Sequence, residues 1–281
     1  MPRLSTLLAA VITLAIGAHT PILAAPKAPA ADTVTTTRVA APARLTARQP
    51  DSILRAEEAA KTDLDYTAGE GETYYFDADG KPADKAAAGG YYRKTLGKTA
   101  DGRLVVQDYY QDGDKPQTAP VILKKGADPR NFASDKVNDS KTVWYRKDGS
   151  VKVIQDFKKG TATGRNRYYQ NGILALETGS GTLEEDDPYR AAGDVARGAR
   201  FYYPDGKILA LGDMGATSNT DLLCYREDGS PMMRIRTKGS EVEFSAWDSA
   251  GKPATREAVA DEAQAAMRRI LRLITDVQNE A

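Results

Sequence analysis

Hydrophobic and polar residues alternate along most of the chain, and glycines interrupt this alternation at regular distances. Outside residues 179–198, an aromatic residue is followed four positions later by a glycine seven times between residues 76 and 251. Asp or Asn precedes six of these glycines, and such pairs favour tight hairpin turns because they tolerate positive φ. The predicted turn glycines are Gly80, Gly113, Gly149, Gly172, Gly206, Gly229 and Gly251.

The spacing of these turns indicates an internal repeat. Gly172 lies 23 residues after Gly149, Gly229 lies 23 after Gly206, and Gly251 lies 22 after Gly229. The longer step from Gly172 to Gly206 is one unit plus an insertion at about residues 179–198. A single hairpin is only marginally stable, so neighbouring hairpins must pair. The pattern predicts a mainly β fold over residues 69–254, an elongated antiparallel sheet of stacked hairpin repeats.

Residues at equivalent positions in two repeat units should have equivalent surroundings. Gly172 and Gly206 should occupy equivalent turns with positive φ, and valine should destabilise the fold at either position. Tyr168 and Tyr202, four residues earlier, should be equally buried.

The last segment, residues 255–281, has the period of an amphipathic helix. Thr255 is a suitable N-cap, and the apolar positions Val259, Ala263, Met267, Ile270, Ile274 and Val277 share one face. We expect this helix to cover the last hairpin and to cap the edge of the sheet. A helix that docks on a partner or a membrane surface is the alternative.

The N-terminal residues lack this pattern. Arg3 followed by the apolar run 4–16 is typical of a secretory signal peptide, which we place at residues 1–24. Residues 25–50 are rich in Ala, Pro and Thr, and this composition predicts a disordered tether. Residues 51–68 predict a short helical lead-in with Asp51 or Ser52 as its cap.

Composition narrows the possible chemistry. The 39 basic residues balance the 39 acidic ones, which argues against a nucleic-acid-binding protein. The one histidine, His19, lies in the predicted signal, so histidine-based catalysis and histidine-ligated metals are excluded from the mature chain. The one cysteine, Cys224, is expected to be buried in a strand. We expect no metal and no cofactor, since no glycine-rich phosphate loop is present either.

Two stretches resemble the bacterial variant of the MORN repeat. They are Phe157-Lys-Lys-Gly160 with Gly164 and the run 168–172, and Gly198 with the run 201–206. The resemblance is good over about 140–255 and loose over 70–140. The resemblance implies the hairpin-repeat architecture. Proteins with this repeat include some described as antitoxins of toxin–antitoxin systems. The matched positions are turn glycines and strand aromatics, so it assigns no functional residue here.

Ten of the 14 tyrosines form five adjacent pairs. Neighbouring strand residues point to opposite faces, so each pair places one ring outward. The outward rings would form a ladder that binds an extended peptide or glycan. Alternatively, the tyrosines pack between hairpins with their hydroxyls in water. The candidate binding residues are Tyr75, Tyr92, Tyr110, Tyr169 and Tyr203.

The insertion contains four consecutive carboxylates, at residues 184–187. Carboxylates bind hard cations or serve as acid–base pairs in glycosidases, so Glu184, Glu185 or Asp187 could serve a hydrolase of envelope polymers. A solvated loop is the alternative.

Together these observations predict a non-enzymatic protein, periplasmic or secreted, that offers a binding or scaffolding surface in the bacterial envelope. Its partner would be a protein or an envelope polymer, with no nucleic acid and no membrane span once the signal is removed. An immunity-like partner of an exported toxin and a carboxylate-based hydrolase are the alternatives.

Overall fold

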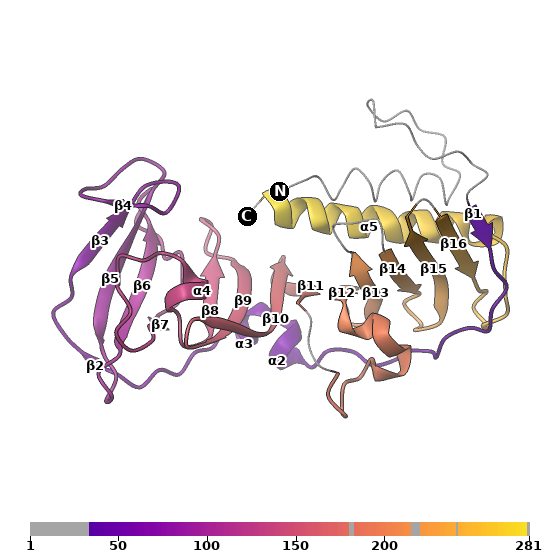
Figure 1. The fold of residues 1–281 in the computed structure, drawn as a ribbon, viewed down its shortest axis with the longest axis horizontal. Coiled ribbons are helices and arrows are strands. Elements are labelled where there is room, and N and C mark those ends of the chain that lie inside the picture. Colours follow the sequence, from indigo (N-terminus) through magenta and orange to yellow (C-terminus); the bar gives the residue numbers. More distant parts are fainter. Residues whose placement is uncertain (1–33, 180–182, 215–219, 240, 280–281) are drawn as a thin grey trace. The chain divides into compact units, whose positions relative to one another are not determined.

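The computed structural model describes residues 34–179, 183–214, 220–239 and 241–279, which divide into two compact units (Figure 1). Unit 1 comprises Met1–Gln49 and Ala175–Ala281, and unit 2 comprises Pro50–Leu174. The described strands belong to a ten-stranded sheet and a six-stranded sheet. The predicted mainly β, antiparallel architecture is confirmed, although the hairpins do not share one continuous sheet. The predicted signal, residues 1–24, lies outside the described residues.

Unit 1 has the strand order β1-β16-β15-β14-β13-β12-β11. Consecutive hairpin strands pair antiparallel, whereas β1 joins β16 in parallel. Its elements are β1 (Val34–Thr36), β11 (Ile173–Thr178), which contains the unit boundary, the 3-10 helix η2 (Arg190–Arg197), β12 (Ala199–Tyr202), β13 (Ile208–Met214), β14 (Thr220–Tyr225), β15 (Pro231–Lys238), β16 (Glu241–Ala246), the 3-10 turn η3 (Glu257–Val259) and helix α5 (Ala260–Asn279).

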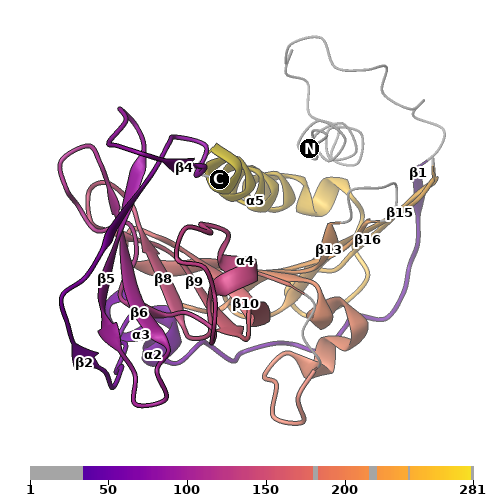
Figure 2. The same ribbon diagram turned by 60° about the vertical axis from the view of Figure 1, so that its left-hand side comes forward.

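Helix α5 runs across successive strands of unit 1 in both views (Figures 1 and 2). Five of the six residues predicted to form its apolar face are buried, and Val277 is partly buried. Thr255 accepts a hydrogen bond from the Ala258 N–H, as its predicted capping role requires. The predicted C-terminal helix is confirmed. At this end of the sheet β1 pairs with β16, so β1 is the edge strand. No helix among the described residues is long and apolar enough to cross a membrane.

Residues 37–49, here called the strap, correct the prediction of a disordered tether. The strap follows β1 and runs past the strand ends of unit 1 (Figure 1). The backbone N–H groups of Thr37, Leu45 and Gln49 donate to the carbonyls of Phe244, Gly229 and Gly206, each at 2.9 Å. Leu45 is 3% exposed. Composition misled here because backbone hydrogen bonds and arginine contacts hold the strap, and low hydrophobicity affects neither of them.

Unit 2 contains two sets of strands, in the orders β10-β9-β8 and β4-β3-β5-β6-β7, with β2 beside β5. The predicted lead-in helix is two short helices preceded by Pro50, and neither Asp51 nor Ser52 occupies the N-cap position. The elements are α2 (Asp51–Leu54), α3 (Ala56–Ala59), β2 (Thr67–Ala68), β3 (Thr73–Phe76), β4 (Pro82–Ala83), β5 (Tyr91–Lys98), β6 (Leu104–Tyr110), β7 (Val121–Ile122), α4 (Ser134–Val137), β8 (Thr142–Tyr145), β9 (Val151–Lys158) and β10 (Thr161–Gln170).

A buried ion pair lies in the six-stranded sheet of unit 2. Arg93 on β5 and Asp108 on β6 form two hydrogen bonds of 2.6 and 2.8 Å, and the Arg93 side chain is 1% exposed. The rings of Phe76 and Phe132 lie 5.8 and 5.5 Å from its guanidinium carbon. The two remaining guanidinium bonds reach the carbonyls of Pro129 and Asn131. The buried arginine therefore makes four hydrogen bonds and lies beside two aromatic rings.

All seven predicted turn glycines have positive φ, from +74° to +87°. Gly206 closes a turn in which its N–H donates to the Tyr203 carbonyl, whereas Gly172 follows Asn171 at φ +51° in a two-residue turn. One residue fewer in that turn reverses which neighbouring side chain faces inward. The equal burial predicted for Tyr168 and Tyr202 is therefore wrong. Tyr202 is 1% exposed, Tyr168 is partly buried, and the buried counterpart is Tyr169.

Cys224 is fully buried on β14, and burial raises the pKa of its thiol to about 12. The thiolate is the form that attacks Ellman's reagent, and a raised pKa makes the thiolate scarce at pH 8. We expect Ellman's reagent at pH 8 to leave the folded chain unmodified and to react rapidly in 6 M guanidinium chloride. Fast labelling of the folded protein would contradict the buried position.

Candidate functional site

A groove of about 500 Å³ opens on unit 1 at the ends of β14, β15 and β16. Its lining carries both signs of charge and two threonine hydroxyls. The lining residues are Thr220, Asp221, Arg236, Thr237, Lys238, Glu241 and Glu243.

Cross-strand pairing sets the order of charges in the groove. Asp221, Arg236 and Glu243 are register partners on three adjacent strands, so their side chains share one face. Arg236 lies 3.3 Å from the Asp221 carboxylate and 3.6 Å from that of Glu243. Arg234 contacts Asp221 through both carboxylate oxygens at 2.6 Å. The groove thus presents a fixed row of alternating charges, which suits hydrogen bonding to a polar segment that carries charges of its own.

The sequence analysis missed this site, although the sequence contains a signal for it. Basic residues occupy alternate positions of β15, ending at Lys238, and acidic residues occupy alternate positions at the start of β16. Because Gly239 lies in the turn between these strands, the two series face each other across the hairpin. A search for charged residues at alternate strand positions would have predicted where the groove lies.

A second polar cluster is buried between strands β11 and β12 and the strap. The Tyr202 hydroxyl donates to Glu177 Oε2 at 2.5 Å and accepts from Gln49 Nε2 at 3.0 Å. Burial, together with the charge of Glu177, raises the pKa of Tyr202 well above its ordinary value. The phenol therefore stays protonated and keeps its hydrogen bond to the carboxylate. The cluster joins the strap to the sheet and is enclosed, since Glu177 and Gln49 are each 6% exposed.

Removing the Tyr202 hydroxyl tests this cluster. Tyr202→Phe leaves the buried Glu177 and Gln49 without their shared partner, and we expect a loss of about 1–3 kcal/mol in the free energy of unfolding. Tyr225→Phe is the matched control, because its hydroxyl is equally buried and has no hydrogen-bond partner among the described residues. We expect the control to be neutral in urea unfolding. Equal losses in both variants would contradict the role given to the Tyr202 hydroxyl.

The predicted outward tyrosine ladder does not form a stacking surface. Tyr92 and Tyr169 are buried. The hydroxyls of Tyr110 and Tyr203 donate to the carbonyls of Tyr145 and Tyr225, the aromatic residues before later turns.

Tyr75 remains partly exposed at the end of a row on the six-stranded sheet. In this row the Tyr92 and Tyr109 ring centroids lie 4.9 Å apart and the rings are nearly parallel, so the two rings stack on each other. Four of the five candidate tyrosines thus pack or bond within the fold, and the hydroxyls of Tyr110 and Tyr203 bond to carbonyls, where the alternative interpretation expected water.

The carboxylates of the insertion do not converge. Glu184 and Glu185 are exposed, whereas Asp187 forms an ion pair with Arg200 and accepts a hydrogen bond from the Tyr189 N–H. Among the residues that the structure describes, no cluster of three or more Asp, Glu, His or Cys side chains is arranged to hold a metal ion. The insertion acts here as a structural element, because η2 packs against β13 and Arg200 donates to the Ala196 carbonyl.

Comparison with known proteins does not extend this picture: no protein-family model matches the chain, and no curated protein matches it either.

Proposed function

We propose that the protein is a non-enzymatic, exported binding module of the bacterial envelope. The hairpin array is the scaffold, and the groove at the ends of β14–β16 receives a polar segment of a partner protein. The groove is the observation on which this proposal rests. Neutralising an exported toxin would be one form of the same function.

Two features support a binding role for the groove. Its arginine is held between Asp221 and Glu243, so little side-chain freedom is lost when a partner binds. Lys238 and Glu241 are exposed at its rim, where charges guide a partner to the correct orientation. Export is proposed from Arg3 and the apolar run that follows it.

Charge reversal at the rim tests the proposal. Lys238 ends the eight-residue strand β15 and is exposed; Lys98 ends the eight-residue strand β5 of unit 2 and is also exposed. The tagged full-length chain would be expressed with each substitution, Lys238→Glu or Lys98→Glu, and bound proteins would be crosslinked and purified from the periplasm. We expect a stoichiometric partner with the wild type and with Lys98→Glu, and its loss with Lys238→Glu.

Two results would contradict the proposal. One is the absence of any stoichiometric partner, and the other is a partner that both substitutions retain. Turnover of purified peptidoglycan by the chain, lost on Glu185→Gln, would favour a hydrolase instead.

A further inference from the structure

The strap meets one turn of unit 1 after another at intervals of four residues. Gln49 N–H donates to Gly206, and Leu45 N–H to Gly229, each at 2.9 Å. Four residues before Leu45, the Ala41 side chain lies 3.5 Å from where a Cβ on Gly251 would be. Each repeat adds two strands, or about 10 Å of sheet, and four residues of extended chain span about 12 Å. One strap step therefore matches one repeat.

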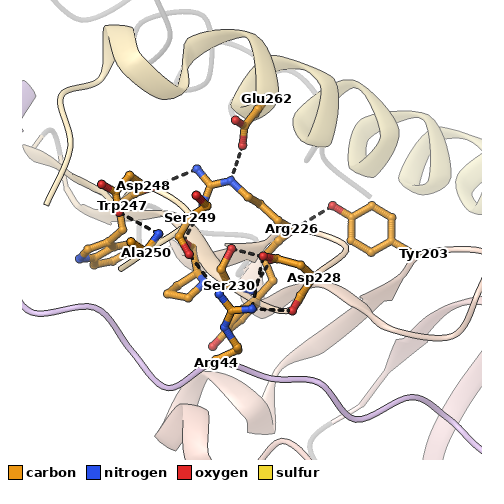
Figure 3. A network of polar contacts seen from close by, with 12 residues as sticks. Arg44, Tyr203, Arg226, Asp228, Ser230, Trp247, Asp248, Ser249, Ala250 and Glu262 are labelled. Atoms are coloured by element: carbon orange, nitrogen blue, oxygen red, sulfur yellow. Dashed lines mark hydrogen bonds and ion pairs between the residues drawn. The ribbon is translucent and has the colours of Figure 1, made fainter. Parts of the chain in front are cut away.

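The strap side chains follow the same interval. Arg44 Nη1 donates to the Asp228 carboxylate and carbonyl, both at 3.3 Å, and its Nη2 donates to the Ser249 carbonyl at 3.0 Å (Figure 3). Four residues later, Arg48 Nε donates to the Asp205 carbonyl at 3.2 Å. Asp205 and Asp228 each precede the turn glycine of their repeat. Arginine thus contacts oxygen atoms of the turn segments at successive steps.

Each arginine is followed by a strap residue whose side chain is buried. Leu45 is 3% exposed, and Gln49 is 6% exposed with its side chain bonded to Tyr202. The docked pattern is therefore Arg-Leu-x-x-Arg-Gln. The arginines form charge-assisted hydrogen bonds, and Leu45 and Gln49 pack into the unit.

The turns have their own bracing, which does not involve the strap. Arg226 donates to the carbonyls of Pro231 and Trp247, both at 2.9 Å, and pairs with Glu262 of α5 (Figure 3). Tyr203 donates to the Tyr225 carbonyl. These bonds fix the spacing of three successive turns, so the surface that the strap covers is preorganised.

From this geometry we propose that the turn edge of unit 1 is a peptide-recognition track. It takes an extended segment with the pattern Arg-Leu-x-x-Arg-Gln, which residues 44–49 supply from the same chain. A partner segment of the same chemistry occupies the track when the strap leaves it. This site is distinct from the groove and does not depend on the function proposed for it.

The proposal is tested by vacating the track in the full-length chain. Leu45→Asp places a carboxylate in the position of a buried leucine, next to the acidic turn at Asp228, and should release the strap. The probe is a fluorescein-labelled peptide with the sequence of residues 37–50. Fluorescence anisotropy should show binding to the Leu45→Asp chain and none to the wild type. A peptide with both arginines replaced by glutamate should bind about tenfold or more weakly, because charge-assisted hydrogen bonds are lost.

Two results would overturn the proposal. One is no peptide binding to a Leu45→Asp chain whose circular dichroism remains native. The other is equal binding to the wild type, which would place the peptide elsewhere.

If Leu45→Asp does not fold, the surface variant Arg44→Glu/Arg48→Glu replaces it, with the same expected binding. Hydrogen exchange on the unmodified chain gives a further test. The amides of Leu45 and Gln49 should exchange more slowly than in the free peptide, and exchange at the free-peptide rate would also refute the track.

Discussion

Asp108→Ala should be among the most destabilising single substitutions in unit 2, with a cost of about 3–5 kcal/mol. The substitution leaves the Arg93 guanidinium buried, at 1% exposure, without its carboxylate. Its bonds to two backbone carbonyls and its contacts with two phenylalanine rings do not neutralise the charge. The measurement is urea unfolding combined with hydrogen exchange of the β5 and β6 amides.

A double substitution separates the charge effect from packing. Arg93→Met/Asp108→Leu removes both charges and keeps most of the volume, so it should cost much less than Asp108→Ala alone. Lys81→Ala is the exposed control, since it breaks the Lys81–Asp79 pair, in which both side chains are largely exposed, and it should change nothing measurable. If the double variant is as unstable as Asp108→Ala, the unpaired charge of Arg93 is not the cause of the instability.

Gly229→Ala should be the second large effect, because the position combines backbone strain with a collision. Gly229 has φ of +80°, and a Cβ there would lie 2.1 Å from the carbonyl oxygen of Leu45 in the strap. Gly149 has φ of +87° and nothing within 4 Å of the corresponding position. The left-handed backbone should cost either alanine about 1–2 kcal/mol. The collision with the strap should add about 1–3 kcal/mol at Gly229 alone.

The comparison is made within each unit, by hydrogen exchange of β14 and β15 for Gly229→Ala and of β8 and β9 for Gly149→Ala. Gly229→Ala should also expose Arg44 and Arg48 to trypsin, whereas Gly149→Ala should leave the strap protected. An equal loss at the two glycines, with the strap still protected in both, would show that the turn does not hold the strap.

Local chemistry along the chain determined much of the fold. An acidic or amide residue before glycine favours a hairpin turn and precedes six of the seven predicted turn glycines, all of which adopt positive φ. The period of the apolar residues determined the helix face that contains Met267 and Ile270, since burial of such a face is what stabilises a helix in a protein. In both cases the residues that decide the structure are close in sequence.

Other features depended on contacts between residues distant in sequence or on a turn shorter by one residue, and only the tertiary structure decided them. The strap bonds to turns more than 150 residues away through backbone groups, which composition does not report. A turn shorter by one residue at Gly172 buried Tyr169 in place of Tyr168, because strand side chains alternate between faces. The alternating charges of β15 and β16 were visible in the sequence, but only register brought Arg236 between Asp221 and Glu243. The sequence determined the turns and the strands, and pairing across the sheet decided which side chains meet.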